Sequence, residues 1–508
     1  MKRIVRFLFS KYFVFALIIL LELLLPTMLL VGLWGRSVYF FVLSAIADVL
    51  VLFSLICLDA NPEYKISWLG AVLLLPVFGA AAYLIFYRVR TSGRTLRLSL
   101  ALSESLEPPI GAFSLGRLSV SDALAAGKAL AILSIDPLAS VYSFTSSRYF
   151  GSGEEMLRAM LSDIEGAERF IFLEYFIIED GVMWQSIFEA LAERAALGVE
   201  VRVLYDDVGC IGRMTYKERE KLRSAGIECA VFGRITPSVS AVHNNRDHRK
   251  ICVVDGRVAY TGGVNIADEY IGKKKRLGTW RDGGIRVQGD AALGFVRLFL
   301  FNYGISVGRI ESAEKYLHPT PSSSDGGYYI PLGSGPYPLY KRQVGKSAII
   351  DIVNQAKRYV YITTPYLIID YDMTEALVGA ARRGADVRII TPGVADKPTV
   401  KVMTKSSYPY LIGSGVKIYE YTPGFIHEKL LLADDLYALV GTINLDYRSL
   451  VHHYEDAVWI YGSPTVVLAR EEYMKTLSVS RKIEKEEAKL TMPERLLRAA
   501  VKLFAPLL

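Results

Sequence analysis

The chain has 508 residues, of which 52% are hydrophobic and 22% charged, and its formal net charge is +7. This length is enough for two or three domains. The four cysteines include no CxxC pair, which excludes a zinc-ribbon protein and a small disulfide framework. The positive charge suits an anionic partner, such as a phospholipid surface or a nucleic acid, but solubility alone also explains it.

Residues 1–95 are predicted to form a transmembrane or membrane-anchor region of two or three helices. Three apolar runs, Tyr12–Trp34, Ser37–Leu58 and Ile66–Tyr87, are each 22 or 23 residues long. A bilayer core of about 30 Å needs roughly 20 helical residues, so each run is long enough to cross it. Basic residues precede the first run and follow the third, and the positive-inside rule places both flanks on one side. Three full spans would separate these flanks, so one run is expected to be re-entrant or interfacial.

Residues 96–140 are expected to link this region to two similar halves, residues 141–325 and 326–480. Each half shows a strand, an amphipathic helix, a glycine and a second strand, which is the pattern of a βαβ unit. The predicted elements are Arg169–Ile178, Trp184–Leu197 and Gly198–Tyr205 in the first half, and Arg358–Tyr366, Met373–Arg383 and Gly384–Ile390 in the second. Two such units predict an α/β fold of two domains with mixed or parallel sheets, joined by the Pro-, Ser- and Gly-rich stretch Pro319–Pro338.

Each half carries the same polar motif, His-x-Lys-x4-Asp-x6-Gly-[Gly/Thr]-x-Asn. Its members are His248, Lys250, Asp255, Gly262, Gly263 and Asn265 in the first half, and His427, Lys429, Asp434, Gly441, Thr442 and Asn444 in the second. Matching positions are 179 residues apart, and only the residue after the first glycine differs. The chance occurrence of two such copies is very low. The other four histidines, His243, His318, His452 and His453, lack this pattern and are expected to be polar surface or loop residues, although His452 and His453 adjoin the second motif.

The motif residues fit the chemistry of a phosphodiester. A buried strand follows each His-x-Lys, and residues i and i+2 of a strand share a face, so histidine and lysine project together. If a pseudo-two-fold axis relates the halves, both pairs meet at one site. Lysine and asparagine side chains then bind the phosphate oxygens, one imidazole attacks phosphorus, and the other transfers the proton. Neither a metal nor a cofactor is expected, because no residue cluster has metal-ligand spacing.

These motifs resemble those of the phospholipase D superfamily. The resemblance implies two phospholipase D-like α/β domains and ping-pong chemistry through a phosphohistidine. We expect His248 to be the nucleophile and His427 the general acid and base, although the reverse assignment is open. The resemblance also implies an acidic residue that orients each histidine, and Asp282 and Glu455 match those positions. Asp255 and Asp434, grouped with the catalytic residues by the motif, would then be more structural than catalytic.

Several segments are similar to bacterial cardiolipin synthases. They are Asn61–Trp68, Asn245–Lys250, Gly262–Tyr270 and Trp280–Asp282. This resemblance implies transfer of a phosphatidyl group from one phosphatidylglycerol to another, giving cardiolipin and glycerol. It also implies anionic membrane lipid as partner, no nucleic acid, and a multi-pass protein of the bacterial inner (cytoplasmic) membrane with its catalytic domains on the cytoplasmic side.

Three other functions stay open from the sequence. A hydrolytic phospholipase D, or a transphosphatidylase with another acceptor alcohol, would share every motif. A phosphatidylserine synthase would need a nucleotide pocket that the sequence does not reveal, and a non-catalytic membrane scaffold is disfavoured by two intact motifs. Residues 481–508 are expected to form a C-terminal amphipathic helix that lies on an anionic membrane or packs on the catalytic domains.

Overall fold

The computed structural model describes residues 34–58, 62–84, 93–107, 132–235, 245–316, 324–336, 340, 342–489, 491–495 and 499. They fall into two compact units. The N-terminal unit comprises Met1–Thr91, Ile235–Asn244 and Met492–Leu508, and the catalytic unit comprises Ser92–Arg234 and Asn245–Thr491. We describe each unit by itself.

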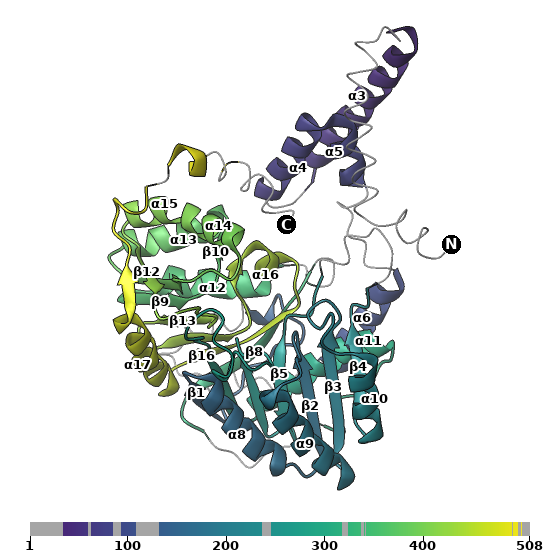
Figure 1. Cartoon of the computed structure of the whole chain (residues 1–508), viewed down its shortest axis with the longest axis vertical. Helices are drawn as coiled ribbons and strands as arrows, with labels where there is room; N and C mark the ends of the chain where they lie inside the picture. Colours follow the sequence, from purple (N-terminus) through teal and green to yellow (C-terminus); the bar gives the residue numbers. More distant parts are fainter. Residues whose placement is uncertain are drawn as a thin grey trace. The chain divides into compact units, whose positions relative to one another are not determined.

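The described part of the N-terminal unit includes the helices α3 (Trp34–Ile56), α4 (Pro62–Leu74) and α5 (Pro76–Ala82) (Figure 1) and a helical turn at residues 492–495. Val51 and Leu55 of α3 are buried with Trp68 of α4 in a small apolar cluster. Other apolar side chains of α3 are exposed; they include Leu43, Ile46, Val49, Leu50, Phe53 and Ile56. Within the described part of the chain, no helix has the length and apolarity required to cross a membrane.

The expected helix over Ile66–Tyr87 is interrupted. The chain leaves α4 at Leu74 and begins α5 at Pro76, because proline has no N–H to donate and its ring is incompatible with a continuing helix. The first apolar run, Tyr12–Trp34, lies outside the described residues except for Trp34. The expected C-terminal helix, residues 481–508, is only partly described: Ser480–Lys482 form strand β17, residues 492–495 are helical, and residues 490, 496–498 and 500–508 lie outside the described residues.

The catalytic unit contains two mixed sheets whose strand orders match. The first sheet runs β1-β7-β6-β5-β2-β3-β4, and the second runs β8-β16-β14-β13-β9-β11-β12 with β17 added at its edge. In both sheets the three strands at the β4 or β12 end are parallel, and the others pair antiparallel. The first sheet consists of β1 (Thr145–Phe150), β2 (Phe170–Tyr175), β3 (Glu200–Asp206), β4 (Glu228–Phe232), β5 (Lys250–Val254), β6 (Val258–Gly262) and β7 (Gly284–Gly289). The second consists of β8 (Tyr328–Ser334), β9 (Tyr359–Thr363), β11 (Asp386–Pro392), β12 (Lys417–Tyr421), β13 (Leu430–Ala433), β14 (Tyr437–Gly441), β16 (Glu455–Tyr461) and β17 (Ser480–Lys482). The predicted two-domain α/β fold is therefore confirmed.

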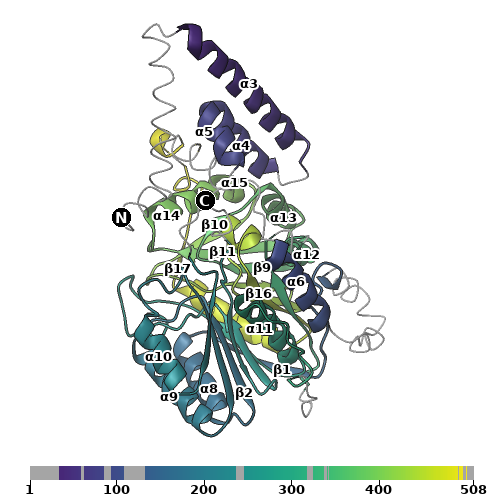
Figure 2. The same cartoon turned by 90° about the vertical axis from the view of Figure 1, so that its right-hand side faces the viewer.

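Helices cover the sheets and join them through one core (Figures 1 and 2). One face of the first sheet packs on α8 (Gly153–Glu165) and α9 (Val182–Ala196). The other face packs on the apolar helix α11 (Ala291–Val307), which also contacts β8 of the second sheet. A single buried cluster thus includes residues of both sheets, and the two domains share their interior. The remaining helices of the unit are α6 (Gly93–Leu106), α10 (Tyr216–Ser224), α12 (Val344–Gln355), α13 (Tyr371–Arg382), α14 (Pro398–Ser406), α15 (Tyr408–Gly413), α16 (Tyr447–Val451) and α17 (Thr465–Ser478), and a short sheet pairs β10 (Leu367–Ile368) with β15 (Leu445–Asp446).

Matched glycines end the first helix of each repeat. Gly198 follows α9 with φ +90°, and Gly384 follows α13 with φ +96°. Glycine adopts this left-handed conformation without the steric penalty of a Cβ atom, so at both places the backbone turns sharply into the next strand. The predicted strand, helix, glycine and strand of each half are confirmed, with bounds that differ by a few residues.

Two stretches expected as linkers contain structure. Residues 328–334 form β8 at the edge of the second sheet, where Pro331 is tolerated because one side of an edge strand needs no donor. Helix α6 covers the start of the expected linker 96–140, and its Leu102 and Leu106 are buried in the shared core. The domain boundaries as a whole stay predictions.

Candidate active site

Both motif histidines lie at the start of a central strand and are held by the opposite domain. His248 and Lys250 enter β5, and His427 and Lys429 precede β13. The His248 N–H donates to the Tyr454 carbonyl over 2.9 Å, and the His427 N–H donates to the Arg281 carbonyl over 2.7 Å. Each domain therefore fixes the backbone of the other domain's histidine.

Each histidine side chain also contacts the other domain. His248 Nδ1 lies 2.9 Å from Oε2 of Glu455, and His427 Nδ1 lies 2.8 Å from Oδ2 of Asp282. Each histidine thus contacts a carboxylate that the other domain supplies. If Nδ1 carries the proton, Nε2 is the free, nucleophilic nitrogen of each ring. The two residues expected to orient the histidines are in position to do so, although their roles stay proposals.

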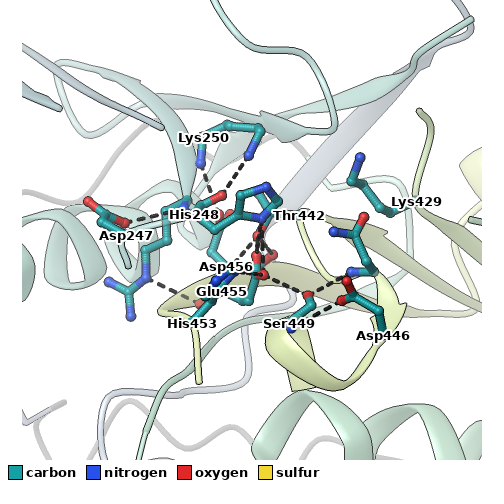
Figure 3. Close-up of polar contacts among 12 residues, drawn as sticks. Asp247, His248, Lys250, Lys429, Thr442, Asp446, Ser449, His453, Glu455 and Asp456 are labelled. Carbon is teal, nitrogen blue, oxygen red and sulfur yellow. Dashed lines mark hydrogen bonds and ion pairs between the residues drawn. The ribbon is translucent and has the colours of Figure 1, made fainter. Parts of the chain in front are cut away.

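Glu455 is held as an anion by four neighbours (Figure 3). In addition to His248, it accepts hydrogen bonds from Thr442 Oγ1 at 2.5 Å and Ser449 Oγ at 2.6 Å. Burial raises the Glu455 pKa, but interaction with His248, which is protonated in the acidic range where Glu455 titrates, and with the nearby His453 holds this pKa well below its ordinary value. Glu455 is fully buried and stays ionised at neutral pH.

Asp282 has a different environment. Its Oδ1 accepts the Gly283 N–H over 2.8 Å, and burial raises its pKa to about 6 against the opposing charge of Lys429. A Cβ atom on Gly263 would lie 2.0 Å from Asp282 Oδ1, so only glycine fits there. The matching residue of the second motif is Thr442, which instead donates to Glu455.

The two lysines are almost completely buried. Lys250 Nζ donates to the His248 carbonyl over 2.7 Å, and Lys429 Nζ donates to the His427 carbonyl and lies 2.9 Å from His427 Nδ1. Burial lowers the pKa of Lys250 to about 8 and that of Lys429 to about 7. Buried ammonium groups without full compensation favour an incoming anion, because a phosphate would restore the lost solvation.

The two motifs share one electrostatic environment. Asp282 and Glu455 both raise the pKa values of Lys250 and Lys429, and Lys250 lowers those of Lys429 and His427. Burial lowers the pKa of His248 to about 3, and burial with the charges of the two lysines holds the pKa of His427 well below its ordinary value. Figure 3 shows Lys429 beside the His248–Glu455 group. Both imidazoles are neutral at pH 7 in this state.

The two motif asparagines are not equivalent. Asn265 accepts the Ile177 N–H over 3.1 Å and donates to the Tyr270 hydroxyl over 2.7 Å, so its amide ties together the loops after β2 and β6. The Asn444 backbone N–H donates to Ser449, while its side-chain oxygen is buried without a hydrogen-bond partner among the described residues. The Asn444 amide is therefore the freer of the two to turn toward a phosphate.

Asp255 and Asp434 lie in turns at the far ends of β5 and β13 from the histidines. Both adopt positive φ, +54° and +58°. The Asp255 carboxylate accepts the N–H groups of residues 168–170, and the Asp434 carboxylate accepts those of residues 357–359. Each carboxylate is thus occupied by backbone N–H groups at the start of β2 or β9, which fits the structural role that the resemblance implies, and the roles of Asp255 and Asp434 stay predictions.

The residue between histidine and lysine faces the opposite side of each strand. Arg249 is fully buried, donating to the Leu298 carbonyl of α11 over 2.8 Å and to the Glu455 carbonyl over 3.2 Å. Glu428 accepts the Tyr149 hydroxyl over 2.6 Å. Both anchor the catalytic strands to neighbouring elements. The period-2 alternation of a strand was the signal available in the sequence for this role.

His453 is a site residue that sequence reasoning left among the surface or loop histidines. Its ring centroid lies 5.5 Å from that of His248, and its Nδ1 is 3.7 Å from Glu455 Oε1. His248, His453 and Glu455 each offer one ligand atom, and these atoms lie within 4.8 Å of one another. The sequence did contain one indication of this placement, because His453 lies only two residues before Glu455. His452 lies at the end of α16, and His243 and His318 are outside the described residues.

Comparison with known proteins places the chain in a family. Residues 160–275 and 349–477 match the family described as cardiolipin synthase, PLD-like domain, and residues 46–88 match a phospholipase D-nuclease N-terminal family. A cardiolipin synthase of Halalkalibacterium halodurans is 32% identical over 456 residues, covering 89% of this chain and 90% of that protein. The chain belongs to the cardiolipin synthase family.

Further family members and a solved structure agree with the fold. A cardiolipin synthase of Geobacillus sp. is 30% identical, covering 92% of this chain and 93% of that protein. An uncharacterized protein of Streptococcus mutans is 43% identical over 369 residues, covering 72% of this chain and 80% of that protein. The crystal structure of the phosphatidylserine synthase of Haemophilus influenzae superposes with a TM-score of 0.54 at 14% identity, over 71% of this chain and 93% of that one. This last likeness concerns the fold alone.

Proposed function

We propose that this chain is a cardiolipin synthase that transfers a phosphatidyl group from one phosphatidylglycerol to another, releasing glycerol. The observation that carries the proposal is that each histidine contacts a carboxylate from the other half of the chain, while both carboxylates act on the two buried lysines. Relatives named cardiolipin synthase that align over about nine-tenths of the chain support this substrate.

In the first half-reaction, His248 Nε2 attacks the phosphorus of phosphatidylglycerol. The P–O bond to the glycerol headgroup breaks, and His427 donates a proton to the departing alkoxide, so that glycerol leaves and phosphatidyl-His248 remains. In the second half-reaction, His427 removes the proton from a headgroup hydroxyl of a second phosphatidylglycerol. That oxygen attacks phosphorus, the P–N bond breaks, and cardiolipin forms with His248 restored.

The carboxylates favour His248 over His427 as nucleophile. Phosphorylation at Nε2 places a positive charge on the ring when Nδ1 keeps its proton, and an ionised partner stabilises that charge. Glu455, which accepts bonds from Thr442 and Ser449, is the more firmly ionised of the two carboxylates. Asp282 has a raised pKa and is therefore the weaker anion, so it stabilises a positive charge on His427 less strongly. His427 can then both gain and lose a proton in every catalytic cycle.

Substrate binding allows His427 to take up from solvent the proton that it then donates to the leaving group. Burial, with the charges of Lys429 and Lys250, lowers the pKa of His427, and burial with the charge of Lys250 lowers that of His248, so both imidazoles are neutral before substrate binds. A phosphodiester between the lysines offsets those charges, so His427 becomes able to hold a proton when substrate is bound. In this scheme Lys250, Lys429 and Asn444 bind the phosphate oxygens, and Asn265 supports the site through Ile177 and Tyr270. Asp255 and Asp434 have structural roles.

The N-terminal unit is proposed to attach the enzyme to the bacterial cytoplasmic membrane, with residues 1–95 as a multi-pass anchor and the catalytic domains on the cytoplasmic side. The first two apolar runs, Tyr12–Trp34 and Ser37–Leu58, and the exposed apolar side chains of α3 support this assignment. A membrane site also suits a reaction whose donor and acceptor are both lipids.

The test is incubation of the purified full-length chain with headgroup-labelled phosphatidylglycerol. Cardiolipin and free glycerol in equal amounts are expected. Phosphatidic acid without cardiolipin would instead identify a hydrolytic phospholipase D, and a phosphatidyl ester of an added alcohol would identify another acceptor. Absence of turnover in the wild type and His248→Ala alike would identify a non-catalytic scaffold.

A further inference from the structure

A run of four basic residues, Lys273-Lys274-Lys275-Arg276, forms a surface loop of the first domain that the reaction does not use. All four side chains are exposed. The loop has defined turns, because the Gly272 N–H donates to the Glu269 carbonyl, and the Lys273 and Lys274 N–H groups donate to the Asp268 carbonyl. We call residues Gly272–Gly278 the basic loop.

Charge in the basic loop is only partly neutralised. Lys274 pairs with Glu179. Lys273, Lys275 and Arg276 have no side-chain hydrogen bond or ion pair with any described residue. These three positive charges lie within four residues and form no ion pair with a described residue, so they repel one another and an anionic partner would reduce that repulsion.

The basic loop adjoins the active site at both of its ends. Just before it, the Tyr270 ring lies 5.7 Å from the ring of His427, and just after it, the Trp280 ring lies 5.9 Å from the same imidazole. Two residues beyond Trp280 is Asp282, which contacts His427 Nδ1. A ligand bound to the basic loop would therefore lie next to the active site, on the side of His427.

Apolar side chains accompany the basic ones. Arg213 donates to Glu179 over 2.6 Å, so the carboxylate that pairs with Lys274 also tethers the segment 207–214. That segment exposes Ile211 (59%) and Val208 (37%). Basic residues beside exposed aliphatic residues are the composition of a surface that contacts anionic lipid headgroups and the acyl boundary beneath them.

We propose that the basic loop, with Ile211 and Val208, is a docking surface for an anionic phospholipid bilayer that presents phosphatidylglycerol to the active site. The inference rests on the proposed function for the identity of the lipid and adds to it the surface that captures the substrate. The positive charges raise the local concentration of anionic headgroups, and the aromatic residues at the loop ends border the site that receives them.

The test compares the full-length wild type with the triple variant Lys273→Gln, Lys275→Gln, Arg276→Gln in nanodiscs of phosphatidylglycerol diluted in phosphatidylcholine. Each basic residue near an anionic surface contributes roughly a five-fold factor, so the apparent KM for phosphatidylglycerol is expected to rise on the order of ten-fold or more. The kcat value stays within about two-fold, because none of the three residues touches the histidines, and the dependence of KM on salt becomes weaker.

Two matched variants sharpen the comparison. The variant Arg257→Gln, Lys357→Gln, Arg358→Gln removes the same charge from exposed residues after β5 and before β9, and its KM is expected to match wild type. The variant Lys273→Arg, Lys275→Arg keeps the charge and is expected to keep the wild-type KM. Equal KM increases in the distant and loop Gln variants, or none in either, would overturn the proposal.

A second readout does not depend on turnover. Amide hydrogen exchange of residues 271–279 is expected to be slower in phosphatidylglycerol discs than in pure phosphatidylcholine discs, and this difference is lost in the loop Gln variant. Equal exchange in the two lipids would end the docking proposal even if cardiolipin is formed. Slowed exchange without cardiolipin formation would retain the docking surface and reject the proposed reaction.

Discussion

The two halves of the active site carry the same motif but treat its histidine differently. His248 contacts Glu455, which Thr442 and Ser449 also hold in place, whereas His427 contacts Asp282, which packs against the bare backbone of Gly263. The single position at which the motifs differ, glycine against threonine, is the position that contacts the carboxylate. A symmetric sequence motif therefore builds an asymmetric pair of histidines, and the asymmetry suits one nucleophile and one proton carrier.

The largest expected effect separates these two roles by the leaving group. His248→Ala should lower kcat by about 10⁴-fold or more with any donor, because the covalent step is lost. His427→Ala should lower kcat by roughly 10²- to 10⁴-fold with phosphatidylglycerol but release p-nitrophenol from a phosphatidyl p-nitrophenyl ester in a burst, since that phenolate needs no acid. Stopped-flow absorbance and detection of the phosphohistidine by mass spectrometry report both steps. If His248→Ala gives the burst and His427→Ala does not, the roles are reversed.

Neutralising the two carboxylates should give unequal losses. Glu455→Gln is expected to lower the single-turnover rate by roughly 10³-fold, because the nucleophile loses the anion that fixes its tautomer and stabilises the charged phosphohistidine. Asp282→Asn is expected to cost about 10- to 100-fold, since the pKa of Asp282, raised to about 6 by burial, makes it the weaker anion. Melting temperatures within a few degrees of wild type would show that both variants fold. Equal losses would remove the electrostatic reason for assigning the nucleophile.

The pH dependence of kcat/KM should reflect the second half of the site. Below about pH 6 Asp282 gains a proton and no longer supports His427, and above about pH 7 to 8 first Lys429 and then Lys250 lose the charge that binds phosphate. Lys429→Arg stays charged and is expected to move the alkaline limb up by about one pH unit. Bound phosphodiester raises the pKa of both lysines, so the alkaline limb of kcat should lie above that of kcat/KM. An unchanged alkaline limb in Lys429→Arg would assign that limb to another group.

A smaller effect is expected at the hydroxyl donors. Ser449→Ala removes a 2.6 Å hydrogen bond to Glu455, and a neutral donor to a buried carboxylate is worth about 1–2 kcal/mol, so kcat should fall roughly 5- to 30-fold. Ser449→Thr keeps the hydroxyl and serves as the conservative control. Because the Asn444 N–H also donates to Ser449, kcat and KM are measured separately. A change in KM alone would point to Asn444 and the phosphate rather than to Glu455.

The fold and the main site residues could be predicted from the sequence, because both follow from patterns between residues close together in the chain. The βαβ periodicity and the i, i+2 spacing of His248 and Lys250 follow from strand and helix geometry. The contacts of His248 with Glu455 and of His427 with Asp282 join residues 207 and 145 positions apart, and no local pattern records which carboxylate contacts which histidine. The composition of β8 led to a wrong prediction: its proline and glycine residues are typical of a linker, but they lie in an edge strand. The break of the third apolar run follows from Pro76 and was available in the sequence.

The smallest effect on activity is expected at the motif aspartates. Asp255→Asn keeps a residue that tolerates positive φ but removes one of the two oxygens that accept the N–H groups of residues 168–170, and unfolding free energy should fall by about 1–3 kcal/mol. Asp255→Ala should cost more, because alanine loses every acceptor and is strained at φ +54°. Denaturant unfolding measures both, and Asp434→Asn should behave alike in the second domain. The kcat/KM of the folded variants should stay within about two-fold of wild type, because these carboxylates lie at the far ends of the strands from the histidines. A loss of activity at unchanged stability would return the two aspartates to the catalytic set, where the motif alone had placed them.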